Sequence, residues 1–174
     1  KNLEAMGVKV DTSEFDYGTV FKKSRNAADS LSKGVNFLLK KNKVELFTGR
    51  GKITGKNEVT IDGNTSISAK HIVVATGSRP IELPPFPFDE ETVLSSTGAL
   101  MLEELPKSLL ILGGGVIGCE FAHILSAFGT EVTIVEMLDR ILPMEDPETG
   151  EVLARSFKKR KIRMLTGTKA VSLE

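Results

Sequence analysis

The glycines at positions 113, 115 and 118 have the spacing G-x-G-x-x-G, which suits a backbone that must approach a phosphate group closely. In such a motif the first glycine permits a tight turn, the second lets the backbone reach a pyrophosphate, and the third lets a helix pack closely on a sheet. The pyrophosphate lies at the helix N-terminus, where free N–H groups and the helix dipole favour negative charge. We therefore predict that Gly113, Gly115 and Gly118 belong to a dinucleotide-binding loop.

Glu136 stands where a protein that binds NAD(H) has an acidic residue. It lies 18 positions after Gly118, and an acid is expected roughly 20 positions after the motif. Its carboxylate would accept hydrogen bonds from ribose hydroxyls and repel a 2′-phosphate, for which Arg140 is the first candidate cation. The residues thus favour NAD(H) over NADP(H), and we expect Glu136→Arg to shift the preference toward NADP. The alternative is a structural glycine turn, with Glu136 merely at a strand end.

The elements around the motif are expected to place it at the edge of a parallel sheet. Apolar runs alternate with amphipathic patterns, and the order strand, helix, strand, helix, strand predicts parallel strands with right-handed crossovers. Asp146 is the expected N-cap of the second helix, with Pro147 in its first turn. The predicted elements are, in chain order, 109–112, 115–128, 131–136, 144–161 and 162–165.

The first part of the chain changes from a helical to an extended pattern. Apolar side chains recur every three to four residues over 16–42, which predicts one long amphipathic helix with Asp16 as its N-cap. The sequence DGN at 62–64 predicts a tight hairpin turn. Short β-branched or apolar segments around it predict strands: KVELF (43–47), RGKITG (50–55) and EVTI (58–61).

A further strand is predicted at 71–76, HIVVAT, because a continuous apolar run is typical of a strand buried on both faces. Thr76, Gly77 and Ser78 would then lie at a strand end, where α/β sheets bind ligands, or would simply form the turn after the strand. Five prolines fall between positions 80 and 107, and they predict a connection between two structural units.

Composition excludes several classes of function. Lys and Arg together balance Asp and Glu at 23 each, so no basic excess favours nucleic acid or an anionic membrane as a partner. No apolar stretch reaches the roughly 18 residues of a membrane span, and no cluster has metal-ligand spacing. The single cysteine, Cys119, can form no redox pair within the chain and is interpreted as a packing residue. Glu120 would stabilise the helix start or face a nicotinamide.

Four segments resemble those of the dihydrolipoamide dehydrogenases, which belong to the pyridine nucleotide–disulfide oxidoreductases. They occur in the same order as in that family and cover nearly the whole chain. The glycine loop and the ATGS segment are shared by the superfamily, whereas LLKKNKV and SSTGAL favour this member over glutathione or mercuric reductase. The four segments are 33–55, 72–84, 93–100 and 111–143.

The resemblance implies an α/β protein with a Rossmann-like βαβ NAD-binding unit that has a parallel sheet. It also implies a partial FAD domain carrying an antiparallel β-meander. Residues 1–90 would form the middle of the FAD domain, and residues 91–174 the N-terminal part of the NAD domain. The residues implied for NAD are Gly113, Gly114, Gly115, Val116, Ile117, Gly118, Cys119, Glu120, Glu136 and Ala170. Those implied for FAD are Gly49, Thr76, Gly77 and Ser78.

The family's reaction passes electrons from dihydrolipoamide through a cysteine pair and FAD to NAD⁺. This chain shows neither the family's first glycine loop nor its cysteine pair nor its acid/base pair, so we expect an internal piece that is inactive alone and holds no catalytic residue. For the whole protein the resemblance implies a homodimer serving a 2-oxo acid dehydrogenase complex in the cytoplasm, or in the mitochondrial matrix of a eukaryote. The alternatives are a stand-alone NAD-binding module without catalysis and another disulfide reductase of the superfamily.

Overall fold

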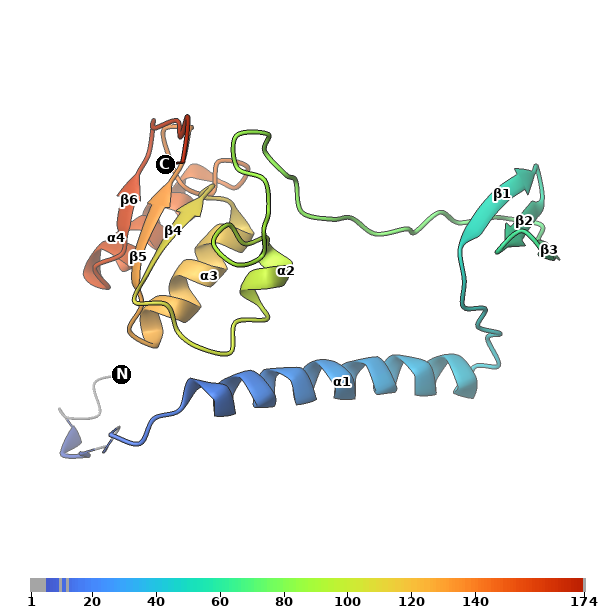
Figure 1. Cartoon of the computed structure of the whole chain (residues 1–174), viewed down its shortest axis with the longest axis horizontal. Coiled ribbons are helices and arrows are strands. Elements are labelled where there is room, and N and C mark those ends of the chain that lie inside the picture. The colour runs from blue at the N-terminus through green and yellow to red at the C-terminus, as the bar shows by residue number, and fades with distance from the viewer. Residues whose placement is uncertain (1–5, 10, 12, 174) are drawn as a thin grey trace. The chain divides into compact units, whose positions relative to one another are not determined.

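The computed structural model describes residues 6–9, 11 and 13–173, and the chain divides into two compact units (Figure 1). One unit contains the described residues up to Phe21 together with those from Pro80 onward, and the other contains Lys22–Arg79. The two units are defined by the contacts between their residues. The predicted boundary near residue 90 separates an FAD-binding from an NAD-binding domain, and because it is defined by the ligands it stays a prediction.

The unit that contains the glycine motif is a three-stranded parallel sheet with helical crossovers, as predicted. Its strands lie in the order β4-β5-β6, and Ile111 of β4 pairs with Ile134 of β5. Each predicted boundary is within a few residues of the observed one. The elements are β4 (Ser108–Leu112), α3 (Val116–Ala127), β5 (Glu131–Val135), α4 (Pro147–Lys159) and β6 (Arg163–Leu165).

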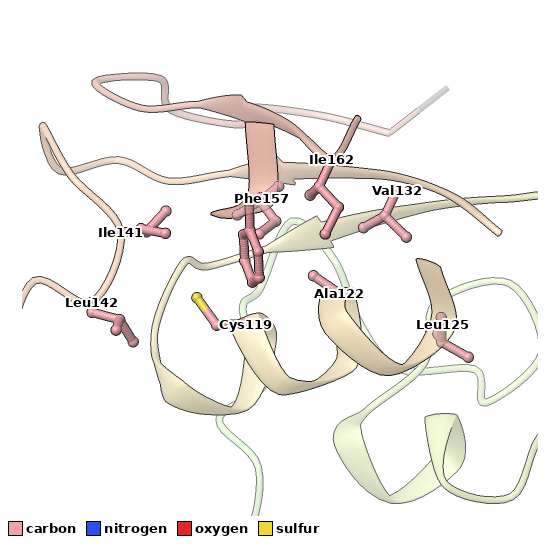
Figure 2. Close-up of a cluster of buried hydrophobic side chains, with 9 residues drawn as sticks. Cys119, Ala122, Leu125, Val132, Ile141, Leu142, Phe157 and Ile162 are labelled. Carbon is pink, nitrogen blue, oxygen red and sulfur yellow. The ribbon is translucent and has the colours of Figure 1, made fainter. Parts of the chain in front are cut away.

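The hydrophobic core of this unit lies between the sheet and its two helices. Ala122 and Leu125 of α3 are buried against β5, and Phe157 of α4 is fully buried in the same cluster. Figure 2 shows Ala122 and Phe157 between α3 and the strands, with Leu125 on a later turn of the same helix. The cluster consists of Cys119, Ala122, Leu125, Val132, Ile134, Ile141, Leu142, Phe157 and Ile162. This packing fixes the start of α3 relative to the ends of β4 and β5.

Two helix caps behave differently although both are aspartates. The carboxylate of Asp16 accepts hydrogen bonds from the backbone N–H groups of Gly18 (2.9 Å) and Thr19 (3.1 Å), and this confirms it as the N-cap of α1 (Tyr17–Lys41). Asp146 occupies the predicted N-cap position of α4, but its side chain makes no capping hydrogen bond. Its backbone oxygen instead accepts from the N–H of Thr149 at 3.0 Å.

The predicted hairpin forms an antiparallel meander of β1 (Gly51–Gly55), β2 (Glu58–Ile61) and β3 (Thr65–Ser68). Asp62 and Gly63 both have positive φ, at 48° and 75°, which is the requirement of a type I′ turn. The turn is therefore as the DGN sequence predicts. The unit that contains the glycine motif also includes the short helix α2 (Ser96–Ala99), which is capped by the hydroxyl of Ser95.

Two predicted strands are wrong. Residues 43–47 and 71–76 form no strand, and Val73 is 87% exposed although it was expected to be buried on both sides. The physical reason is that a strand needs a neighbour, because its N–H and C=O groups bond across a ladder and not within the segment. No described strand pairs with either segment. Of the described helices, none combines the length and apolar character needed to cross a membrane.

Candidate functional site

The glycine loop connects the end of β4 to the start of α3 and lies beside the end of β5. Gly113 has a φ of 107°, a conformation that L side chains rarely adopt, and its N–H donates to the backbone oxygen of Val135 at 2.8 Å. The loop therefore turns sharply as it leaves the sheet. It lies at the carboxyl edge of parallel strands, which is where open α/β sheets bind ligands.

Two further glycines are required by close packing. A Cβ atom on Gly118 would overlap with the backbone oxygen of Gly113 and lie 3.2 Å from a methyl carbon of Ile111. A Cβ atom on Gly114 would lie 2.9 Å from a methyl carbon of Ile141. The protein's own structure thus accounts for both of these glycines.

Gly115 is different, because nothing in the structure excludes a side chain from it. No atom lies within 4 Å of the position its Cβ would take, and its φ of −72° and ψ of −176° are open to any residue. Gly115 is the N-cap of α3, and no side chain caps this helix. The N–H groups of the first turn have no acceptor inside the helix. The space beside Gly115 is therefore lined by hydrogen-bond donors.

Glu136 lies next to the glycine loop and is only 8% exposed. Its Oε2 accepts from the backbone N–H of Gly114 at 2.7 Å, and its Oε1 accepts from the N–H of Leu138 at 2.8 Å. A carboxylate has about four acceptor positions, so roughly two remain for other donors. The sequence predicts contact with a ribose, and that stays a prediction. The bond to Gly114, which joins residues 22 positions apart, was not predicted.

Arg140 is already engaged with the backbone. Its Nη1 donates to the backbone oxygens of Leu142 (3.2 Å) and Glu145 (3.0 Å), and its Nη2 donates to that of Pro143 (2.9 Å). By its place in the sequence, Arg140 is the first cation after Glu136 that could face a 2′-phosphate. The structure points the guanidinium into its own loop instead, and within the described part of the chain the Glu136 carboxylate forms no ion pair.

Cys119 packs beneath the loop, with its Sγ 3.4 Å from the backbone oxygen of Gly114. Burial and, to a smaller extent, the negative charge of Glu136 together raise the pKa of the Cys119 thiol to about 11. The thiol therefore stays protonated at neutral pH and is a weak nucleophile. The interpretation of Cys119 as a packing residue agrees with this environment.

We expect Cys119 to react slowly with iodoacetamide in the folded protein. At pH 8 the rate should be roughly tenfold or more below that of the urea-unfolded chain, because the thiolate is the nucleophile and the folded thiol is buried. The folded-state rate should rise as the pH approaches 11. Mass spectrometry of quenched samples gives both rates. Equal rates in the folded and unfolded chains would contradict the expectation.

The remaining predicted NAD residues lie around this loop. The side chains of Val116, Ile117 and Glu120 are exposed on the first turns of α3, so both interpretations of Glu120 stay open. Ala170 is half-buried and follows β6. It lies two residues after Thr168, whose N–H donates to the backbone oxygen of Glu136 at 2.9 Å. The structure thus gathers the glycine loop, Glu136 and the segment after β6 at one sheet edge.

The residues predicted for FAD are not enclosed. Thr76, Gly77 and Ser78 lie in the exposed segment that forms no strand. Gly49 is also exposed, and its φ of 151° together with the overlap that a Cβ would make with the Asp62 carboxylate explains why glycine is needed there. Within the described part of the chain, no group of three or more His, Cys, Asp or Glu side chains is placed to hold a metal ion.

Comparison with known protein families identifies the family of this chain. The family model for pyridine nucleotide-disulphide oxidoreductases matches residues 3–174. The chain belongs to this family. Among family members, it is 39% identical over its full length to a dihydrolipoyl dehydrogenase of Chlamydia pneumoniae. It is 41% identical, over 97% of its length, to the mitochondrial dihydrolipoyl dehydrogenase 1 of Arabidopsis thaliana.

A solved structure also matches this chain. The crystal structure of LpdA from Mycobacterium tuberculosis superposes with a TM-score of 0.83 and 26% identity, over 97% of this chain. The match confirms an α/β fold that combines the parallel sheet with the antiparallel meander. The chain spans 38% of the Chlamydia relative and 34% of the Arabidopsis relative. The match therefore establishes the family of this chain, and the activity of the whole protein that contains it is proposed below.

Proposed function

We propose that the edge formed by the glycine loop, the start of α3 and Glu136 binds NAD(H). The observation that carries this proposal is the contrast among the glycines of the loop. Packing or backbone conformation accounts for Gly113, Gly114 and Gly118, but Gly115 faces open space in an ordinary conformation. Glycine is preferred over alanine at a helix N-cap, but Ser, Asp or Asn would cap the helix better still, and the open space at Gly115 would admit their side chains. Close approach of a ligand explains why no such capping side chain stands there.

The chemistry of this edge suits a pyrophosphate with an adenosine ribose beside it. The uncapped N-terminus of α3 offers N–H donors and a partial positive charge to the phosphates. Glu136 has acceptor positions left for the ribose hydroxyls after binding two backbone N–H groups. A 2′-phosphate would meet this carboxylate without compensation, because Arg140 is bonded to three carbonyl groups. These features support NAD(H) over NADP(H).

The test is Gly115→Ala, compared with the wild-type chain by calorimetric titration with NADH. We expect the affinity to fall by about tenfold or more, because a methyl group occupies the path of the pyrophosphate. The unfolding free energy should fall by no more than about 1 kcal/mol, since the added Cβ meets no atom and only the preference of the N-cap position for glycine over alanine is lost.

Gly34→Ala is the matched control. Gly34 lies inside α1, and a Cβ there also meets no atom within 4 Å. This variant should bind NADH as the wild type does. If Gly115→Ala binds NADH as tightly as Gly34→Ala does, the proposed site is wrong.

For the whole protein we propose oxidation of dihydrolipoamide with NAD⁺ through FAD and a redox disulfide. The support is that relatives about 40% identical are named dihydrolipoyl dehydrogenases. When bound, a flavin would accept two electrons from a dithiol and pass them as a hydride to NAD⁺. This chain would contribute the NAD(H) edge, and Gly49 and 76–78 would line part of the flavin site. A homodimer serving a 2-oxo acid dehydrogenase complex belongs to the same proposal.

The direct test is an assay of the full reading frame that contains this chain. We expect NAD⁺ reduction with dihydrolipoamide and much less with NADP⁺. Turnover of a different disulfide substrate, without activity on dihydrolipoamide, would identify another reductase of the family. Nucleotide binding without any turnover would favour a binding module.

A further inference from the structure

The loop between β5 and α4 curls around one side chain. Arg140 is half-buried, and its guanidinium donates to three backbone oxygens, those of Leu142, Pro143 and Glu145, at 2.9–3.2 Å. Arginine is always protonated and carries only donors, so several carbonyl groups can point at it without conflict. Three carbonyls of a single loop turn toward one cation only if the chain between them bends tightly.

The bend has a cost at Leu142. This residue has a φ of 50°, in the left-handed region that is uncommon for side chains other than glycine, asparagine and aspartate. Such a conformation persists where surrounding bonds determine it more strongly than local preference does. At Leu142 the carbonyl is held by Arg140, and the N–H donates to the backbone oxygen of Gly114 at 2.7 Å.

The curled loop thereby holds the middle of the glycine loop. Ile141 fills the space that a Cβ on Gly114 would need, and the N–H of Leu142 binds the Gly114 oxygen. On the other side, the N–H of Gly114 donates to Glu136 at 2.7 Å. Gly114 is consequently buried and fixed at both its N–H and its C=O, although glycine is the residue with the most conformational freedom.

We infer that Arg140 is a positioning residue for the dinucleotide site. It fixes the glycine loop through Leu142 and Ile141 and does not touch the nucleotide. The expected effect of Arg140 on nucleotide affinity rests on the proposed function. The contacts through which Arg140 fixes the glycine loop lie within the protein and do not depend on that function. A residue that shapes the pyrophosphate site acts on a part that NADH and NADPH share. Loss of Arg140 should therefore weaken both nucleotides by the same factor.

The experiment compares Arg140→Ala and Arg140→Lys with the wild-type chain. The control is Arg155→Ala, because Arg155 is an exposed arginine of α4 whose guanidinium pairs with Glu151 of the same helix at 3.5 Å. In unliganded protein we expect Arg140→Ala to shift the amide resonances of Gly113, Gly114 and Gly115, and to leave those of β1–β3 unchanged. Arg140→Lys should shift them less, since an ammonium can reach some of the three carbonyls. Arg155→Ala should leave the glycine resonances in place.

NADH and NADPH titrations then follow the same variants. We expect Arg140→Ala to weaken both nucleotides roughly tenfold by one common factor, with Arg140→Lys between it and the wild type. Unchanged glycine resonances in folded Arg140→Ala would overturn the inference, as would a loss confined to NADPH, which indicates direct contact with a 2′-phosphate. If Arg140→Ala does not fold, the resonances and affinities of Arg140→Lys decide. If the wild type binds neither nucleotide, the proposed function fails, while the resonances still decide the role of Arg140.

Discussion

Replacing Gly118 by valine is expected to destabilise the parallel-sheet unit by about 3 kcal/mol or more. The new Cβ would overlap with the backbone oxygen of Gly113, and its methyl groups would press on Ile111. Overpacking of a core costs roughly 1–3 kcal/mol when side chains can move aside. Here the neighbour is a backbone atom in a loop held by other bonds, so relief requires α3 to move away from β4. Urea unfolding followed by far-ultraviolet circular dichroism measures the loss.

Gly115→Val is the matched control for this experiment. It introduces the same side chain into the same loop, three positions earlier, where no atom lies within 4 Å of the new Cβ. We expect its unfolding free energy to fall by only about 1 kcal/mol, because valine is a poorer N-cap than glycine but its Cβ meets no neighbouring atom. Equal destabilisation by the two valines would show that the loop does not approach α3 as closely as the structure describes.

Glu136→Gln is expected to weaken NADH binding by about tenfold or more and to narrow the preference for NADH over NADPH. The substitution keeps the shape of the side chain but removes its charge and replaces one acceptor by a donor. In the protein both oxygens of Glu136 accept backbone N–H groups, from Gly114 and Leu138. One of these N–H groups would face an NH₂ group, and a buried unsatisfied donor costs roughly 1–3 kcal/mol of stability. Calorimetric titration and urea unfolding give the two quantities.

Glu131→Gln is the control, because Glu131 is an exposed glutamate at the opposite end of the same strand. It should leave both stability and nucleotide preference unchanged. A Glu136→Gln protein with wild-type stability and wild-type preference would show that this carboxylate neither holds the loop nor reads the ribose.

The structure also changes the result to be expected from Glu136→Arg. From the sequence alone that substitution should shift the preference toward NADP. In the structure Glu136 is buried and accepts two N–H groups, so a guanidinium at this position would place a buried cation against donors. We expect loss of folding stability before any change of preference. The shift of preference toward NADP would be the expected result only if the side chain at position 136 were exposed to solvent.

Elements with local signals were predictable from the sequence. The glycine motif, the alternating apolar runs of β4, β5 and β6, and the DGN turn each depend on residues close together in the chain, and each forms as expected. The strand predicted at 71–76 does not form, because apolar character alone does not provide a neighbouring strand to pair with. The sequence of the segment by itself cannot show whether such a neighbour exists.

The contacts that build the site were not predictable for a related reason. The Glu136–Gly114 hydrogen bond and the Leu142–Gly114 hydrogen bond join residues that the sequence separates by more than 20 positions. Both depend on the fold having brought two loops to one sheet edge. Arg140 is close in sequence to the three residues whose carbonyl groups it binds. Those carbonyls converge because Leu142 adopts a left-handed conformation, and the sequence Ile-Leu-Pro at 141–143 gives no sign of that conformation. The sequence therefore indicates which loop is the candidate for nucleotide binding, and it does not indicate which contacts hold that loop in place.

The unequal reasons for the loop glycines bear on how such motifs persist through evolution. Under the proposed function, a descendant of this protein that no longer bound a nucleotide would still need Gly113 for its turn, and Gly114 and Gly118 for packing. Selection for folding alone would preserve those three, and mutation would be free to replace Gly115. A G-x-G-x-x-G pattern that has drifted only at its second glycine would thus mark a lineage that has kept the fold and abandoned the ligand.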